Sequence, residues 1–376
     1  MTHIDVLLPR PCTLEPVRVG IKDGLIASIS PAEGPCGLVA MPGFIDIHTH
    51  GGAMVDVNHI TGRSDLETLS HFYACHGVTS VLLSVMTDTK ERMKELVRTL
   101  AAGLEEPLGG ADIVGIHLEG PFLSPEYRGA MPEDLVLKGD WDFLQELLEA
   151  GRGKVRYITL APEVEGVMDL IGKLALDGRV GISMGHSSAD YETAMRAVDA
   201  GVRSATHLFN AMKLFHMHRP AVSGAALESD EVYTELIVDG FHLHPATVRL
   251  VAKTKGWDRI IAVSDSIMAS GLGSGRYKLG VNDVIVGEDG DAKLPDGVRA
   301  GSTLTLDVAY RRLKAFTGAG DHLLAKALST NAARLLKLDD RGVVAVGKRA
   351  DLVLLDRDGT VARTIVAGRT VYGKGE

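Results

Sequence analysis

The chain has 376 residues, of which 45% are hydrophobic and 24% are charged, and its formal net charge at pH 7 is -9. This composition is typical of a globular protein, and the length allows one large domain with a smaller companion. No basic run stands out against the negative charge, so we expect no nucleic-acid partner and no binding to an anionic membrane surface.

The cysteines and the apolar runs indicate a compartment. Cys12, Cys36 and Cys75 are too few and too scattered for a disulfide framework, which suits a reducing environment. The first residues lack a basic segment followed by a long apolar core, and no later run is long enough to cross a bilayer. We therefore predict a cytoplasmic protein without a membrane anchor.

Short β-like runs occur at both ends of the chain. Between residues 4 and 40 they are separated by glycine and proline turns, and residues 351–372 repeat the pattern. Neither end makes a domain alone. Since chain ends often lie close in space, we predict that 1–41 and 341–376 together form one small β-sandwich.

The segment 42–340 alternates between short apolar runs and helical patterns. The candidate strands are 44–50, 78–84, 113–119, 155–160, 180–186, 204–208, 235–239 and 260–265. Apolar residues at helical spacing fill the gaps, at 65–76, 89–104, 167–176, 191–200 and 245–255. This α/β pattern predicts a (β/α)8 TIM-type barrel rather than an open sheet. A glycine-rich β-insertion at about 275–301 then precedes two helices, at 303–316 and 322–328.

Two histidines close the first predicted strand of the barrel. His48 and His50 project from the same face, about 7 Å apart, because side chains alternate along a strand. Neutral imidazole is a common ligand of divalent metals, and Gly51 and Gly52 leave room for an approaching group. Two unrelated polar residues at a strand end are the alternative, and the pair alone does not decide between them.

Reactive side chains follow most of the other strands. The strand ends of a barrel open onto one face, where the active sites of this fold occur. Six of the eight ends carry a possible ligand or acid-base group, namely His48 with His50, Glu119, His186, His207, Asp239 with His242, and Asp265. A single histidine is more often structural, but carboxylates that follow aliphatic runs are costly to bury without a cation. The joint placement therefore predicts a metal site.

These residue types indicate metal-assisted hydrolysis. Glu119, His186 and His207 would give one ion two nitrogens and one oxygen and leave a position open for water or substrate. The histidine pair of the first strand would hold a second ion that shares Glu119, or would shape a one-metal site. The metal would lower the pKa of bound water towards ~7, and Asp265 would act as general base and then as general acid. We expect one or two divalent ions per subunit, Zn²⁺ ahead of Fe²⁺ or another divalent ion.

Seven motifs occur in order over nearly the whole chain, at 42–51, 117–122, 185–187, 206–212, 239–242, 264–265 and 300–305. They resemble the N-acetylglucosamine-6-phosphate deacetylases of the amidohydrolase superfamily. The resemblance implies a barrel flanked by a β-sandwich built from both termini, usually in a homodimer. It also implies an enzyme that removes the acetyl group of an amino-sugar phosphate and releases acetate and an amine.

The resemblance also implies a role for each matching position. The metal ligands would be Glu119, His186 and His207, with His48 and His50 matching the pair of members that can hold a second metal. Asp265 would be the catalytic acid and base. Contacts to the sugar phosphate would come from Asn210, Ala211 and His242.

The chain departs from the family pattern in the substrate site. Met131 stands where the family usually has a histidine that helps to polarise the substrate, and a thioether cannot donate that hydrogen bond. The phosphate-binding arginine of the family falls on His218, with Arg219 one place later. Arg299 replaces a usually apolar residue, and arginine can grip a phosphate or carboxylate in a forked geometry that histidine cannot copy.

These departures leave several interpretations open. Arg219 or Arg299 takes over the phosphate contact, or Arg299 forms a surface ion pair and Met131 simply packs. Alternatively, the enzyme hydrolyses another N-acyl amino sugar or a different N-acyl compound. A non-catalytic scaffold is disfavoured because every candidate ligand and acid-base group is present. The further candidate substrate contacts are Met131, His218, Arg219, Arg299, Ala300 and Gly301.

Overall fold

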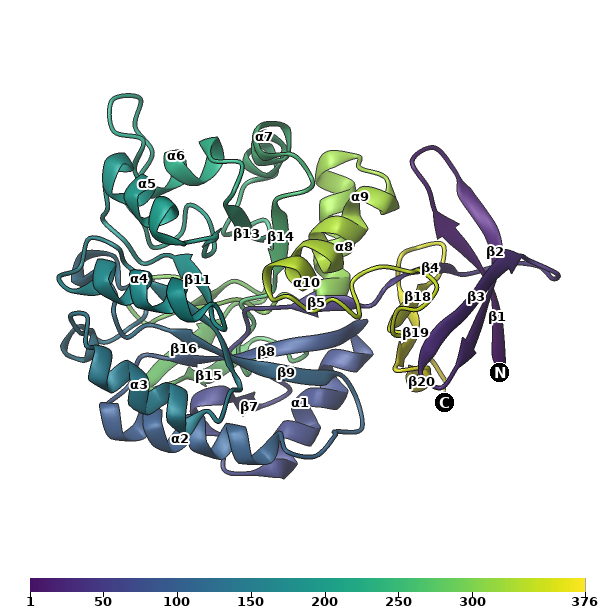
Figure 1. Cartoon of the computed structure of the whole chain (residues 1–376), viewed down its shortest axis with the longest axis horizontal. Helices are drawn as coiled ribbons and strands as arrows, with labels where there is room; N and C mark the ends of the chain where they lie inside the picture. Colours follow the sequence, from purple (N-terminus) through teal and green to yellow (C-terminus); the bar gives the residue numbers. More distant parts are fainter. Residues whose placement is uncertain (376) are drawn as a thin grey trace.

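The computed structural model describes residues 1–375, which form a barrel with a small β-domain at one side (Figure 1). Eight strands make the barrel sheet in the order β14-β13-β12-β11-β10-β9-β8-β5. They are β5 (Phe44–Asp46), β8 (Val78–Met86), β9 (Asp112–Glu119), β10 (Val155–Leu160), β11 (Gly181–Met184), β12 (Ser204–Ala205), β13 (Tyr233–Ile237) and β14 (Ile260–Val263). All neighbouring pairs are parallel. The predicted (β/α)8 barrel is confirmed.

The barrel closes where the segment after β5 meets the segment after β14. Thr49 and Ser266 form an isolated parallel bridge. The N–H of Asp265 donates to the carbonyl of His48 at 2.9 Å, and the N–H of His50 donates to the carbonyl of Ser266 at 2.7 Å. The backbone that carries the histidine pair is therefore part of the seam that closes the barrel.

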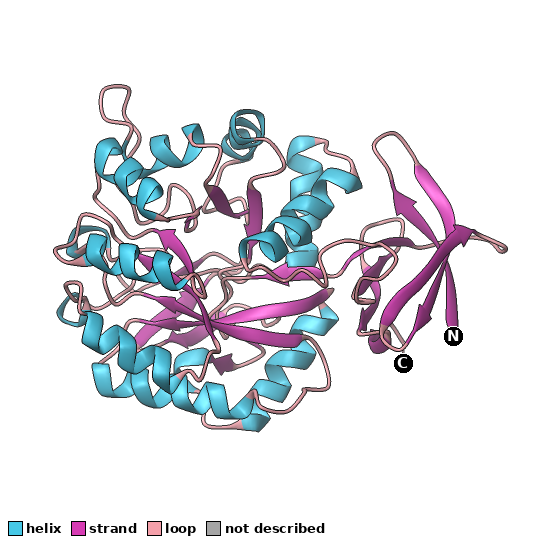
Figure 2. Cartoon of the chain, viewed as in Figure 1, coloured by secondary structure: helices cyan, strands magenta, loops and turns pink. Residues whose placement is uncertain are grey.

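Helices cover the outside of the barrel sheet (Figure 2). They are α1 (Arg63–Cys75), α2 (Lys90–Gly103), α3 (Trp141–Ala150), α4 (Val167–Asp177), α5 (Tyr191–Ala200), α6 (Ala221–Glu228), α7 (Pro245–Lys255), α8 (Leu306–Thr317), α9 (Asp321–Ala325) and α10 (Asn331–Leu335). Strands and helices share one apolar core, as expected for a parallel sheet that helices cover. Within residues 1–375, no helix combines the length and the apolarity that crossing a bilayer requires.

Three of these helices, α3, α6 and the short α10, lie in stretches for which the sequence predicts none. Helix α6 is buried from Ala221 to Ala226, so it lacks the polar face that makes a helix visible as a periodic pattern. Helix α3 does carry a start signal, because the Asp140 side chain caps it by accepting from the N–H of Phe143 at 3.0 Å.

The two ends of the chain build the small domain together. Its strands are β1 (Thr2–Pro9), β2 (Leu14–Lys22), β3 (Leu25–Pro31), β4 (Val39–Pro42), β18 (Leu352–Leu355), β19 (Val361–Val366) and β20 (Arg369–Gly373). They form a sheet in the order β20-β19-β18-β4-β1-β2-β3. Apolar side chains of both halves, such as Val19 and Leu354, share one core. The predicted β-sandwich from both termini is thus confirmed, and the N-terminal strands join the C-terminal ones through the antiparallel β4–β18 pair.

The glycine-rich insertion forms a three-stranded antiparallel sheet of β15 (Gly275–Leu279), β16 (Asn282–Val286) and β17 (Ala292–Lys293). Its apolar side chains form a separate core with residues of the barrel loops, among them Met86, Leu123 and Met131. The insertion is therefore anchored at the mouth of the barrel.

A cluster of charges links the small domain to the barrel. Arg349 contacts Asp112 of β9 at 2.5 Å and Asp351 at 3.0 Å. The side chain of Arg341 is only 9% exposed; it pairs with Asp340 at 2.8 Å and lies 3.5 Å from Asp112 and 3.8 Å from Asp351. Asp351 is almost fully buried, so the positive charge of these two arginines compensates a carboxylate whose burial would otherwise destabilise the fold.

We expect Arg341→Met to lower the free energy of unfolding by about 3 kcal/mol, because it leaves buried carboxylate charge without part of its compensation. Urea denaturation followed by circular dichroism measures this difference. The control is Lys94→Gln, which breaks the exposed pair with Glu146 and should cost less than about 1 kcal/mol. Equal denaturation midpoints for the two variants would contradict the proposed role of the cluster.

Candidate metal centre and substrate cavity

The carboxylate of Glu119 lies at the mouth of the barrel between four imidazole rings. Its Oε1 is 3.1 Å from the Nε2 of His186 and 3.2 Å from the Nε2 atoms of His207 and His48. Its Oε2 is 3.2 Å from the Nε2 of His50. All five side chains are buried. Residues from the ends of four strands thus meet around one carboxylate.

These side chains and Asp265 divide into two groups that could each hold an ion. One group is Glu119, His186 and His207, and the other is His48, His50 and Asp265; within each, the ligand atoms lie within 4.8 Å of one another. Two ligands at about 2.1 Å from a tetrahedral ion lie about 3.4 Å apart. The observed separations of 3.0 Å between the Nε2 atoms of His186 and His207 and 3.3 Å between those of His48 and His50 are close to this value.

The hydrogen bonds of the other ring nitrogen set the tautomers of the histidines. The Nδ1 of His50 faces the carbonyl of Ser84 at 3.2 Å, and the Nδ1 of His186 faces the carbonyl of Tyr127 at 3.0 Å. In each case Nδ1 must carry the proton. When the ring is neutral, as in a metal ligand, Nε2 therefore carries the lone pair on the side that faces Glu119.

A buried glutamate orients His48 in the same way. Glu235 on β13 accepts from the Nδ1 of His48 at 3.1 Å and from the hydroxyl of Tyr157 at 2.6 Å. It also accepts from the N–H of His207 at 3.3 Å. One fully buried carboxylate thus positions a ligand of each group.

The electrostatics of the site favour a cation. Burial alone lowers the pKa of His50, but Glu119 and Asp265 outweigh it and raise that pKa to about 9. The same two carboxylates raise the pKa of His48 against burial. In turn, burial raises the pKa of Glu119, but His48 and His50 hold it well below its usual value. Positive charge is therefore stabilised between these groups, and the donor set of imidazoles and carboxylates fits a divalent metal.

Several of these residues adopt a backbone conformation that is unusual outside glycine. The φ angles are 49° for His186, 31° for His207 and 48° for Asp265. Such left-handed conformations cost of the order of 1–3 kcal/mol each and cluster at functional sites. Here they turn the chain sharply at the end of a strand, so that each side chain faces the mouth.

A cavity of about 270 Å³ lies above the metal ligands. Among the predicted substrate contacts, it is lined by Met131, Asn210, Ala211, His242, Arg299 and Gly301. From the candidate metal and acid-base groups, it is lined by His50, Glu119, His186, His207 and Asp265. Residues separated by more than two hundred positions thus enclose a single space beside the candidate metal centre.

With this geometry in view, comparisons with known proteins give the family. The family model described as "Amidohydrolase family" matches residues 39–371. The chain belongs to the amidohydrolase family. The resemblance stated from the motifs is confirmed.

The relatives of this amidohydrolase are similar over more than nine-tenths of their length. An N-acetylglucosamine-6-phosphate deacetylase of Bacillus subtilis (strain 168) is 38% identical over 368 residues, covering 94% of this chain and 92% of the relative. An N-acetylgalactosamine-6-phosphate deacetylase of Escherichia coli O157:H7 is 33% identical, covering 95% and 96%.

Solved structures agree with the sequence relatives. The crystal structure of N-acetylglucosamine-6-phosphate deacetylase from Thermotoga maritima superimposes with a TM-score of 0.92 at 36% identity, covering 99% of this chain and 100% of that one. A mutant of the Mycobacterium smegmatis deacetylase in complex with N-acetyl-D-glucosamine-6-phosphate gives a TM-score of 0.91 at 31% identity, with the same coverage.

Not every predicted contact of this amidohydrolase lines the cavity. His218 and Arg219 lie in an exposed loop, and Ala300 is buried in the core of the insertion. His48 is fully buried beside His50 and Glu119. Their assignment as substrate contacts or metal ligands stays a prediction.

Arg299 forms an ion pair and also lines the cavity, so two interpretations that the sequence leaves open both apply to it. Its Nε and Nη2 donate to the two oxygens of Asp291 at 3.0 and 3.2 Å, and its side chain is 42% exposed. It also lines the cavity. Asp291 therefore fixes the guanidinium at the rim of the cavity and leaves Nη1 unused by that ion pair. Met131 packs with the insertion while it lines the same cavity.

Sequence reasoning missed the groups that orient the ligands. Glu235 is the one charged residue of a largely buried strand, and this is the signal that could have identified it. His117 also lies beneath the ligands, where it bonds to Ser84 at 2.8 Å and Thr159 at 2.9 Å. Burial holds the pKa of His117 well below its usual value, so it is neutral and supports the ring of His48 at 4.7 Å.

We expect Glu235→Gln to weaken metal binding by about 10- to 100-fold, because the substitution removes the charge that orients His48. Competition with a chelator of known affinity measures the change. The control is Glu228→Gln, which alters only an exposed hydrogen bond with Tyr191 and should leave the affinity unchanged. If both variants hold metal equally tightly, Glu235 does not support the centre.

Proposed function

We propose that this amidohydrolase is a metal-dependent deacetylase of N-acetyl-D-glucosamine 6-phosphate, which it converts to D-glucosamine 6-phosphate and acetate. The observation that carries the proposal is the Glu119 carboxylate held by four imidazoles, with Asp265 beside them at the floor of a cavity. Full-length similarity to deacetylases of amino-sugar phosphates supports the reaction class.

Asp265 is suited to move the proton of the hydrolysis. A bound divalent ion supplies Lewis acidity, which lowers the pKa of water and polarises a carbonyl. Burial alone would raise the pKa of Asp265, but His48 and His50 outweigh this effect and hold the pKa below its usual value. The carboxylate is therefore ionised at neutral pH. It can therefore accept a proton from the attacking water and deliver it to the leaving nitrogen. Its backbone N–H is held by the carbonyl of His48, which fixes its place over the cavity.

The metal and the assembly are part of this proposal. Nitrogen and oxygen donors with an open side suit Zn²⁺, ahead of Fe²⁺ or another divalent ion, and the two groups allow one or two ions. A homodimer is supported by the loop that carries His218, in which Leu214, Phe215 and Met217 are 79%, 53% and 78% exposed. A cytoplasmic location remains our expectation.

The identity of the sugar is the part of the proposal with the nearest alternative. The relative from Escherichia coli O157:H7 is named for N-acetylgalactosamine 6-phosphate, which differs in one stereocentre. Arg299 is the arginine of this chain that lines the cavity, so we assign it the phosphate contact in preference to Arg219. The sequence departures at Met131 and His218 keep another N-acyl compound as the second candidate.

Acetate release by the purified, metal-loaded protein tests the proposal. The panel contains N-acetylglucosamine 6-phosphate, N-acetylgalactosamine 6-phosphate, unphosphorylated N-acetylglucosamine and an N-acyl amino acid. We expect the highest kcat/KM for the first compound and loss of activity with a chelator. A higher value for an unphosphorylated compound would overturn the substrate, and no hydrolysis together with no bound metal would indicate a scaffold.

We expect Asp265→Asn to lower kcat by about 10²- to 10⁴-fold, because an amide cannot accept the proton. Metal content, measured on the same sample, should stay at one equivalent or more, since Glu119, His186 and His207 are intact. Asp283→Asn, in an exposed ion pair of the insertion, is the matched control and should retain full activity. Turnover of the Asp265 variant near that of the control would contradict the assigned role.

A further inference from the structure

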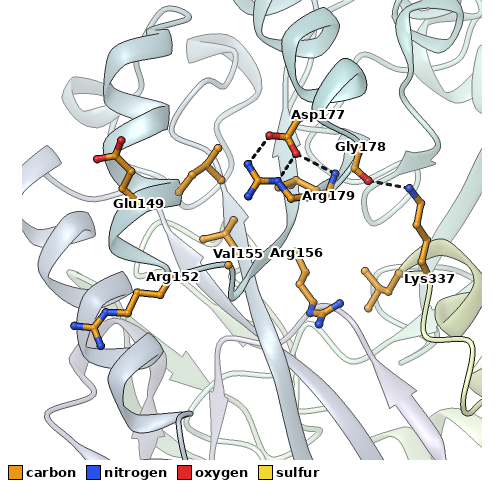
Figure 3. A pocket seen from close by; sticks show the side chains of 12 residues that line it. Glu149, Arg152, Val155, Arg156, Asp177, Gly178, Arg179 and Lys337 are labelled. Atoms are coloured by element: carbon orange, nitrogen blue, oxygen red, sulfur yellow. Dashed lines mark hydrogen bonds and ion pairs between the residues drawn. The ribbon is translucent and has the colours of Figure 1, made fainter.

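A second and larger cavity lies at the opposite end of the barrel from the catalytic one. It encloses about 620 Å³ and is lined by Val155 and Arg156 where β10 begins, and by Val180 just before β11 (Figure 3). The last turns of α3 and α4 and the residues after α10 complete it. Catalytic groups of this fold occur where the strands end, so this cavity is remote from the metal centre.

The lining of this cavity is basic although the whole chain is acidic. A neighbouring cavity of about 340 Å³ shares Arg156, Arg179 and Lys337 with it. Six basic side chains line the two cavities, namely Arg152, Arg156, Arg179, Arg203, Arg334 and Lys337, against the two acidic ones, Glu149 and Asp177. Since the net charge of the chain is -9, this concentration of positive charge is local.

Most of these cations already have carboxylate partners. Ion pairs engage four of them: Arg179 pairs with Asp177 of the lining, and three pair with carboxylates outside it, Arg152 with Glu105, Arg203 with Glu231 and Arg334 with Asp258. Among the residues that the structure describes, the polar partner of the Lys337 side chain is a backbone carbonyl, that of Gly178, at 2.8 Å. Within residues 1–375, Arg156 forms no ion pair, and its buried Nε has no hydrogen-bond partner.

The position of Arg156 on its strand makes this unpaired charge unusual. The next residue, Tyr157, points into the barrel, where it donates to Glu235, so Arg156 must point outward between the sheet and the helices. Gly115 on β9 leaves room for its stem, because a Cβ there would come within 2.9 Å of the Cγ and Cδ of Arg156. A half-buried guanidinium without an anion is costly in this layer.

We propose that this cavity binds a small phosphate-bearing anion, which Arg156 and Lys337 contact directly. The guanidinium of Arg156 offers its donors in the planar fork that matches phosphate oxygens, and Lys337 retains two donors. Leu148, Val155, Val180 and Leu336 form an apolar wall beside these cations, and the volume admits an ester as well as inorganic phosphate. The ligand stabilises the native state and takes no part in the hydrolysis.

Figure 3 identifies a matched control for this site. The side chain of Arg152 lies on the other side of the cavity from Lys337, and its guanidinium points away from the space between them. Its charge is already compensated by Glu105 at 2.6 Å. Loss of Arg152 therefore removes the same charge from the same rim but leaves the proposed contacts intact.

Isothermal titration at constant ionic strength tests the proposal on the metal-loaded protein, with inorganic phosphate and with glucose 6-phosphate as probes. We compare the wild type with Arg156→Gln, Lys337→Gln and Arg152→Gln. Any binding in the catalytic cavity is common to all four proteins. We expect one binding event to weaken by about tenfold or more in Arg156→Gln and Lys337→Gln, because each of these variants loses a charge-assisted contact. In Arg152→Gln, which loses no such contact, the affinity should stay within about twofold of the wild type.

The outcomes separate the ligand sources and the failure modes. A tighter complex with glucose 6-phosphate than with inorganic phosphate supports an ester, and equal affinities support the free ion. Titrations that are identical in wild type, Arg156→Gln and Lys337→Gln overturn the site. Acetate release should stay at the wild-type rate in all variants, so failure of this proposal is distinguishable from failure of the proposed function. If either Arg156→Gln or Lys337→Gln does not fold, the other variant still tests the site.

Discussion

The structure depends on burying one carboxylate, that of Glu119, among imidazoles at the end of a parallel barrel. A buried carboxylate and the lone pairs of surrounding imidazoles are tolerable only when positive charge lies between them, whether as protons or as a metal ion. The ligands come from the ends of different strands, apart from the pair His48 and His50 after β5, and the sheet holds these ends at fixed spacing. The fold therefore does the work of bringing side chains as distant as Glu119 and His207 within 3.2 Å of each other.

The closing seam of the barrel connects this charge cluster to stability. His48 and Asp265 belong to opposite edges of the sheet, and a backbone hydrogen bond between them joins the first and last strands. The residues that bind and transfer protons are thus also residues through which the barrel closes. Strained φ angles at His186, His207 and Asp265 persist because strands on both sides hold them in place.

Much of the fold and the centre of the site follow from the sequence, for identifiable reasons. Strand ends are readable because apolar runs stop at polar residues, and the barrel topology then brings Glu119, His186 and His207 together. Glu235 was missed because a charged residue inside a strand shows no partner until the neighbouring strands are known. The all-buried helix α6 shows no periodicity, and the outward direction of Arg156 is visible only once Tyr157 is placed inside the barrel.

The insertion β15–β17 and the barrel contribute different residues to the catalytic cavity, and this separation bears on how the enzyme can evolve. It supplies Arg299 and Leu279 to the cavity wall, whereas the metal ligands all come from the barrel. It also packs through its own apolar core. Mutations in this module can therefore alter which sugar is accepted while the hydrolytic machinery beneath stays intact, so new substrate preferences are accessible by small steps that do not pass through an inactive enzyme.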